Sequence, residues 1–129
     1  MDDARWFWAI IVPNHEGATE LHDLTAAERN GLMADAAQLS KAIAAITQCR
    51  SVNIAMLGNV VRQLHCHVVA RNETDPAWPG PVWGHGAREP MERGEVAKRI
   101  KALQLELGSD HHHGGHVPHD SAAGRKEPT

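Results

Sequence analysis

Cysteine is scarce in this chain of 129 residues, and its scarcity excludes a fold held together by disulfide bonds. The two cysteines, Cys49 and Cys66, do not belong to a spaced cysteine framework. Cys66 lies inside a strand-like segment and Cys49 lies near the end of a helical one, so both are predicted to be free thiols in a reducing compartment. The length predicts a single domain with a small hydrophobic core.

Long hydrophobic runs, a basic N-terminus and a strong charge of either sign are also missing. No apolar run approaches the roughly 18 residues of a membrane span, and residues 1–5 lack the basic start of a signal peptide. A formal net charge of -3 gives no general electrostatic attraction to nucleic acid or to an anionic membrane. These absences predict a cytoplasmic protein with neither nucleic acid nor a membrane as a partner.

Hydrophobic periodicity in the first half of the chain predicts a strand and then a long helix. Residues 5–12 are apolar and aromatic, which indicates a strand buried on both faces. A capping box formed by Thr25 and Glu28 then opens a helix of about five turns. The apolar stripe of this helix contains Leu32, Ala36, Leu39, Ile43 and Ile46.

A β-hairpin is predicted next, followed by an irregular loop. Residues 51–57 and 62–70 are the predicted strands, and Gly58 and Asn59 lie in the turn between them. Three prolines and three glycines exclude regular structure from residues 75–86. Because this loop also contains tryptophan, we expect it to pack on the rest of the domain.

A second helix is predicted to begin at Pro90 and to end at Gly108. Its apolar stripe contains Val96, Ile100, Leu103 and Leu107. Beyond it, large apolar residues are almost absent, so residues 109–129 are predicted to be a disordered, histidine-rich tail. The domain is therefore expected to span residues 1–108.

The most informative stretch is Gln-Leu-His-Cys-His-Val-Val at residues 63–69, which alternates polar and apolar residues. Successive side chains of a strand point to opposite faces, so Gln63, His65 and His67 are expected to share one face. Two imidazoles side by side on a rigid element are suited to proton transfer, nucleophilic attack or metal binding.

This stretch resembles the signature of the histidine triad (HIT) family, His-φ-His-φ-His-φ-φ, with Gln63 at the position of the first histidine. The order of the surrounding elements is also similar to that of HIT proteins. The resemblance implies an α+β fold in which an antiparallel sheet carries a long packed helix. The N-terminal hairpin that is usual in the family is expected to be missing here, because Met1 lies almost directly before the first predicted strand. The resemblance also implies a homodimer.

The resemblance implies chemistry at a nucleotide phosphate, with a nucleoside phosphoramidate or a dinucleoside polyphosphate as substrate. His65 matches the nucleophile that forms a nucleotidyl-histidine intermediate. His67 matches the histidine that hydrogen-bonds the phosphate or protonates the leaving group. Gln63 matches a position that orients these two residues, but its side chain does not titrate.

Three further positions resemble nucleotide-binding residues of the family. Gly58 matches a glycine beside the phosphate, where the missing Cβ lets a backbone amide approach an anion. Asn59 matches a phosphate donor, and Asn53 resembles an asparagine that contacts the phosphate or the ribose. Val60 departs from the serine or threonine that HIT proteins often carry there. No cofactor is required for the attack, although a divalent cation could accompany a polyphosphate substrate.

Two alternatives to the hydrolase or transferase stay open. One is a scaffold similar to HIT proteins that binds nucleotides without turnover. The other is a metal-binding protein that uses His65 and His67, or the histidines of the tail. Two histidines on one strand supply only two ligands, and no Asp, Glu or Cys lies nearby at ligand spacing, so no metal site is predicted there.

Overall fold

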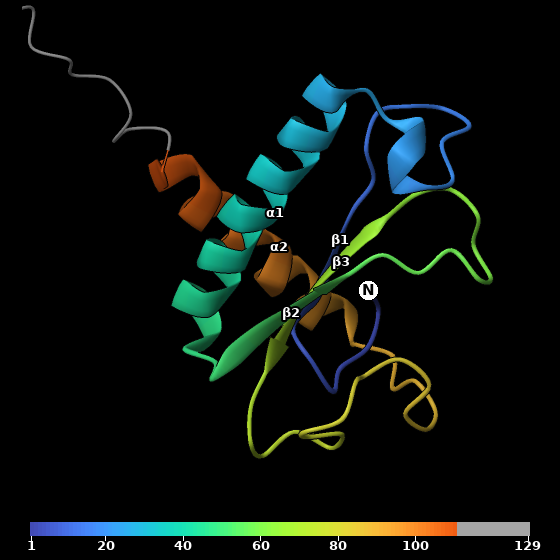
Figure 1. Ribbon diagram of the computed structural model, residues 1–129. Coiled ribbons are helices and arrows are strands. Elements are labelled where there is room, and N and C mark those ends of the chain that lie inside the picture. Colours follow the sequence, from blue (N-terminus) through green and yellow to red (C-terminus); the bar gives the residue numbers. More distant parts are fainter. Residues whose placement is uncertain (111–129) are drawn as a thin grey trace, which may run out of the picture.

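Three antiparallel strands and two α-helices build residues 1–110, the part of the chain that the computed structural model describes (Figure 1). The strands are β1 (Trp8–Ile11), β2 (Ser51–Ala55) and β3 (Cys66–Arg71), and the helices are α1 (Ala26–Thr47), α2 (Arg93–Asp110) and the short 3-10 helix η1 (Leu21–Asp23). The strand order is β1-β3-β2, so β3 is the central strand. The predicted α+β class is confirmed, and no strand precedes β1 within the described residues.

Helix α1 begins at the predicted capping box. The amide of Glu28 donates to Thr25 Oγ1 over 3.1 Å, and the amide of Thr25 donates to Glu28 Oε1 over 2.9 Å. Gln48, in the left-handed conformation with φ of 51°, ends the helix. The predicted stripe is buried at Leu32, Ala36, Leu39 and Ile43 and half-buried at Ile46.

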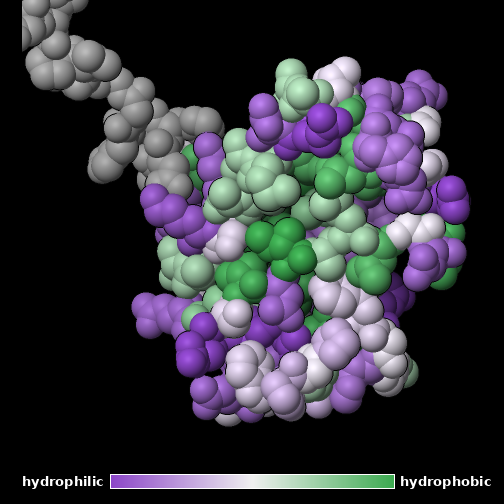
Figure 2. Space-filling model, in the orientation of Figure 1, coloured by the Kyte–Doolittle hydropathy of each residue, from purple (hydrophilic) through white to green (hydrophobic). Residues whose placement is uncertain are grey.

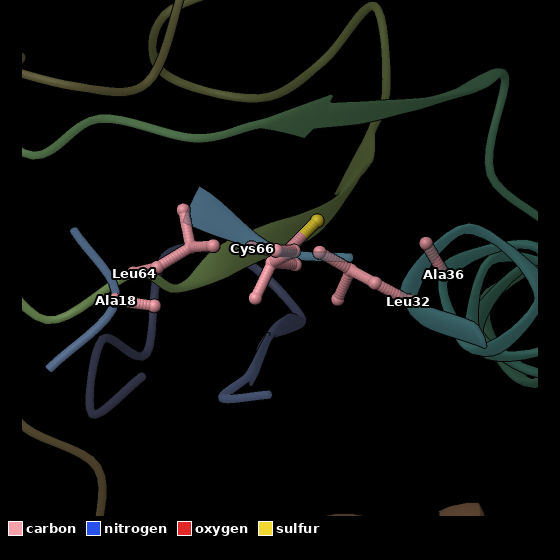
Figure 3. Close-up of a cluster of buried hydrophobic side chains, with 6 residues drawn as sticks. Ala18, Leu32, Ala36, Leu64 and Cys66 are labelled. Atoms are coloured by element: carbon pink, nitrogen blue, oxygen red, sulfur yellow. The ribbon is translucent and has the colours of Figure 1, made fainter. Parts of the chain in front are cut away.

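The main core lies between the helices and one face of the sheet. Leu39 and Ile43 of α1 pack on Val68 and Ala70 of β3, and Leu103 of α2 packs against the same cluster. Figure 3 shows the neighbouring cluster, in which Leu32 and Ala36 of α1 point toward Cys66, with Leu64 and Ala18 beyond it. Figure 2 shows hydrophobic residues gathered in the middle of one face of the molecule, where α1 lies against β2.

The opposite face of the sheet is partly covered by the loop that follows β3. Val82 and Trp83 of this loop pack with Trp8 and Val69, and Trp6 completes the buried cluster. The expectation that the loop at residues 75–86 packs on the domain is therefore confirmed. The cover ends near Trp8, and farther along the first strand Ile10 is 37% and Val12 is 60% exposed. The prediction that the first strand is buried on both faces is therefore wrong at its C-terminal end.

A buried arginine fastens this loop to the sheet. Arg71, at the end of β3, donates to Asp75 over 2.9 and 3.2 Å and to the carbonyl of Gly80 over 2.7 Å. Its remaining nitrogen donates to Asn53 Oδ1 on β2 over 2.7 Å. Burial by itself raises the pKa of Asp75. The hydrogen bonds from Arg71 and from the amides of Asn72 and Ala77 together outweigh burial and hold that pKa well below its usual range.

The predicted hairpin is confirmed as an antiparallel pair, but its second strand is shorter than predicted. Pairing between β2 and β3 ends at Ala55 and His67, and β3 begins at Cys66. The amide of Leu64 donates to the carbonyl of Ala18 over 2.9 Å, so the 12–20 loop holds the chain there in place of β2. Residues 56–65 therefore form an irregular connection, and His65 lies just before the strand.

Helix α2 differs from the prediction at both ends, because it begins at Arg93 and continues through Gly108 to Asp110. Ile100 of its predicted stripe is 51% exposed. The rest of the predicted tail, residues 111–129, lies outside the described residues. No helix within residues 1–110 is both long and apolar enough to cross a membrane.

Candidate active site

The two histidines of the motif line a cavity of about 570 Å³ at the start of β3. Gln63 and Asn59 contribute polar groups to the same cavity. The rest of the lining is apolar and comes from β1 and the residue after it, the 56–65 connection and the loop after β3, namely Ile10, Val12, Leu57, Val60, Val61 and Trp83, together with Met1. The cavity therefore surrounds a small polar centre with apolar walls.

The alternation of residues 63–69 places these imidazoles as predicted, although only part of the stretch is a strand. Leu64 and Cys66 are buried in the core beneath α1. His65 and His67 lie on the other side, with their ring centroids 4.8 Å apart and their planes inclined by 69°. Because β3 is the central strand, the site rests on the best-supported element of the sheet.

His65 is tethered by the backbone next to it. Its Nδ1 lies 2.7 Å from the carbonyl oxygen of Gln63. A carbonyl oxygen only accepts hydrogen bonds, so Nδ1 carries the proton when the ring is neutral. The proton-free nitrogen of His65 is therefore Nε2, which keeps its lone pair for a ligand or an electrophile.

His67 is buried, with 6% of its surface exposed, and it lies among aromatic rings. Its ring centroid is 5.5 Å from those of Trp8 and Trp83, in edge-to-face arrangements. The indole Nε1 of Trp8 donates to His67 Nδ1 over 2.9 Å. Burial lowers the pKa of His67 to about 4, and the neighbouring His65 acts in the same direction, so His67 is neutral at pH 7.

The other predicted site residues are only partly brought together. Asn59 lines the cavity, whereas Gly58 lines a smaller one of about 170 Å³ that also contacts His65. A Cβ at Gly58 would approach only the carbonyl of Thr19, at 3.7 Å, so packing does not require glycine there. Asn53 does not line either cavity, and its side-chain oxygen is occupied by Arg71. Their roles at a nucleotide stay predictions.

The side chain of Gln63 contacts a loop instead of the histidines. Its Nε2 donates to the carbonyl of His15 over 3.5 Å, and the His15 ring in turn pairs with Glu28 over 2.8 Å. The contact with His65 comes from the Gln63 backbone. Any residue at this position would supply that backbone carbonyl, so the Gln side chain mainly attaches the 56–65 connection to the loop that contains His15.

Comparison with known proteins decides the family of this site. The HIT domain family matches residues 1–74, which is more than half of the chain and includes both histidines of the cavity. The chain belongs to the HIT family. No match was found among curated proteins.

Solved structures of HIT proteins have a similar fold. A histidine triad protein from Sinorhizobium meliloti 1021 is 39% identical, with a TM-score of 0.80 over 82% of this chain and 78% of that chain. One from Bradyrhizobium japonicum is also 39% identical, with a TM-score of 0.80 over 83% and 80% of the two chains. One from Marinobacter aquaeolei VT8 is 36% identical, with the same TM-score over 84% and 80%.

In this HIT protein, two tryptophans beside the site were not predicted from the sequence. Trp8 hydrogen-bonds His67, and Trp83, which lies beyond the region matched by the family, packs on the same ring. A buried indole N–H usually finds a partner, so a tryptophan in a strand-like run is a signal for such a bond. The acceptor could not be named without knowing which strand pairs with the first one.

The alternative of a metal-binding protein needs a cluster of ligands, and the described part of this HIT protein contains none. Within residues 1–110, no three His, Cys, Asp or Glu side chains are grouped so that they could hold one ion. His65 and His67 also each have one nitrogen occupied by a protein partner. The histidines of the predicted tail lie outside the described residues.

Proposed function

We propose that this HIT protein is a nucleotide hydrolase or transferase that acts through a nucleotidyl-histidine intermediate on His65. The observation that carries the proposal is the hydrogen bond from His65 Nδ1 to the carbonyl of Gln63, in a ring that lines the cavity. It leaves Nε2 with its lone pair, and a neutral imidazole is a good nucleophile near pH 7. The substrate is a nucleoside phosphoramidate or a dinucleoside polyphosphate.

In the first step, the lone pair of His65 Nε2 attacks the α-phosphorus of the substrate. The bond from phosphorus to the leaving nitrogen or oxygen breaks, and its electron pair leaves with that atom, which takes a proton from water. Nδ1–H keeps donating to the carbonyl of Gln63 and so stabilises the positive charge that develops on the ring.

In the second step, a water molecule attacks the phosphorus. The bond between phosphorus and Nε2 breaks, its electrons return to His65, and the proton of the water passes to solvent. The product is a nucleoside monophosphate, or a new phosphate ester if an alcohol replaces the water.

The neighbours of His65 fit a phosphate between the two cavities. Asn59 lines the larger cavity and Gly58 the smaller one, so both contribute polar backbone or side-chain groups close to His65. His67 donates to a phosphoryl oxygen from the cavity wall. Asn53 holds Arg71, from which its side-chain oxygen accepts a hydrogen bond, and in this proposal it does not contact the nucleotide. No metal takes part in the attack, and a divalent cation enters only with a polyphosphate.

A homodimer is part of the proposal, since the HIT resemblance implies one. Strand β2 is at an edge of the sheet. Ile54 of β2 is 43% exposed and Met33 of α1 is 51% exposed, so hydrophobic surface is available on both elements. Light scattering after size-exclusion chromatography measures the mass, and a monomer at micromolar concentration contradicts the dimer.

The covalent intermediate can be tested with adenosine 5′-phosphoramidate and intact-protein mass spectrometry. The His67→Ala variant is expected to accumulate one adenylyl group that maps to His65, and His65→Ala is expected to carry none. His15→Ala is the matched control, because this histidine pairs with Glu28 and does not line the cavity. It should release product as the wild type does.

Two results reject the proposal. An adenylyl group on the His65→Ala protein excludes His65 as the nucleophile. A wild type that forms neither adduct nor product over hours supports the scaffold, which calorimetry distinguishes because a scaffold still binds the nucleotide.

A further inference from the structure

Trp8, beside the site, makes a hydrogen bond that fixes the tautomer of His67. Its Nε1 lies 2.9 Å from His67 Nδ1, and the two side chains are 7% and 6% exposed. An indole nitrogen can only donate a hydrogen bond. His67 Nδ1 must therefore present its lone pair, and the proton of the neutral imidazole must lie on Nε2.

The sheet brings these two side chains together. In the register of β1 and β3, Trp8 is opposite Val69 and Ile10 is opposite His67. Trp8 and His67 are thus diagonal neighbours on one face, within the reach of an aromatic side chain. The contact therefore depends on the pairing of the edge strand β1 with the central strand β3.

Other indoles nearby do not make such a bond. The Nε1 atom of Trp83 is buried without a hydrogen-bond partner among the residues described, and the Trp6 indole acts on Asp75, whose pKa it helps to lower, and not on His67. Trp83 nevertheless packs edge-to-face on Trp8 at 5.8 Å and on His67 at 5.5 Å. Of these three tryptophans, Trp8 is therefore the one that both donates a hydrogen bond to His67 and packs on its ring.

We propose that Trp8 is a positioning residue that locks His67 in the Nε2–H tautomer, so that His67 meets a phosphoryl oxygen as a neutral hydrogen-bond donor. The inference deepens the proposed function and rests on it for its catalytic part. The tautomer itself follows from the Trp8 contact alone. It assigns His67 to stabilising the phosphate, and the leaving group takes its proton from water.

The two imidazoles then have opposite states at their Nε2 atoms. His65 has its proton on Nδ1 and a lone pair on Nε2, whereas His67 has the reverse. If His67 adopted the other tautomer, two lone pairs would face an anionic phosphate and the donor would be lost. The groups that act on the charge of His67 are His65 and the amino group of Met1, and both disfavour a second positive charge.

The test compares Trp8→Phe with Trp6→Phe. Both variants replace a buried indole on the same segment by a phenyl ring, but only Trp8→Phe removes the donor to His67. The ¹⁵N chemical shifts of the His67 ring report the tautomer and its pKa without any substrate. Wild type and Trp6→Phe are expected to show the Nε2–H tautomer alone, and Trp8→Phe a mixture of both tautomers.

Turnover of adenosine 5′-phosphoramidate gives the second readout. With Trp8→Phe, kcat is expected to fall in proportion to the share of His67 that loses the Nε2–H tautomer, by about twofold if the two tautomers are equally populated, while Trp6→Phe stays near the wild type. An unchanged His67 tautomer in Trp8→Phe overturns the proposal. An altered tautomer with unchanged kcat also overturns it, since the tautomer then has no role in the reaction.

Two further results keep this test independent of folding and of the proposed function. If Trp8→Phe does not fold, the ¹⁵N–¹⁵N coupling across the Trp8–His67 hydrogen bond is measured in the wild type, and its absence together with an Nδ1–H tautomer overturns the proposal. If the wild type shows the tautomer but no adduct on His65, the proposed function fails and the lock on His67 stands as a structural property.

Discussion

Replacing Asp75 by alanine is expected to destabilise the fold more than any change at an exposed ion pair. The Arg71 side chain is 2% exposed, and the carboxylate of Asp75 is 7% exposed. Asp75 accepts two of the hydrogen bonds that Arg71 donates, over 2.9 and 3.2 Å. Without Asp75, the guanidinium keeps only the oxygens of Gly80 and Asn53, which carry no formal charge.

The expected loss in the free energy of unfolding comes from leaving the buried Arg71 guanidinium without its carboxylate. Removing one partner of a buried ion pair costs about 3–5 kcal/mol. The two remaining hydrogen bonds reduce the cost to Arg71, so we expect about 3 kcal/mol for Asp75→Ala. Urea denaturation at pH 7, followed by tryptophan fluorescence, measures the free energy of unfolding.

A neighbouring ion pair supplies the control. Arg50 and Glu73 approach to 3.4 Å, but their side chains are 70% and 67% exposed. Exposed pairs contribute about 0–1 kcal/mol, so Glu73→Ala is expected to have little effect. Equal losses in Asp75→Ala and Glu73→Ala would refute the reasoning, because burial would then make no difference to the pair.

Three other predictions concern pH, packing and thiol reactivity. Lowering the pH from 7 to 4 is expected to remove about 3 kcal/mol through His67, because the unfolded histidine takes up a proton near the ordinary pKa of 6.5 whereas the folded one has a pKa of about 4. Urea titrations of the wild type and of His67→Gln at both pH values measure this difference, and equal pH slopes contradict it. Leu32→Ala is expected to cost about 2–5 kcal/mol, since Leu32 is 4% exposed against Cys66, and a loss below about 1 kcal/mol in the same assay contradicts that packing. Cys49 is expected to react with iodoacetamide faster than Cys66, which is 1% exposed and whose pKa is raised by burial, and equal labelling rates by mass spectrometry contradict this.

Features that depend on nearby residues could be predicted from the sequence. The start of α1 requires only Thr25 and Glu28, three positions apart, and its buried stripe follows from the helical repeat. The alternation of residues 63–69 likewise predicted which side chains face the core and which face the cavity. This held although β3 begins only at Cys66, because the extended chain continues to alternate before the strand.

Features that depend on distant partners could not be predicted. The start of β3 is set by the bond between Leu64 and the carbonyl of Ala18, and the state of His67 by Trp8, 59 residues earlier. Asn53 has the residue type of a nucleotide ligand, but Arg71 occupies its oxygen. In each case the deciding contact joins segments whose meeting depends on the complete fold.

The irregular connection between β2 and β3 can change in length without changing the pairing of the strands. Pairing between β2 and β3 stops at Ala55 and its partner His67, so inserting residues between Ala55 and Cys66 causes no register slip, which would turn every side chain of a strand to the other face. His65 takes its orientation from the carbonyl two residues before it, so the contact that orients the ring is local to residues 63–65. Evolution or a protein engineer can therefore lengthen the segment around Val60 to reshape the cavity wall, while the sheet and His65 stay as they are.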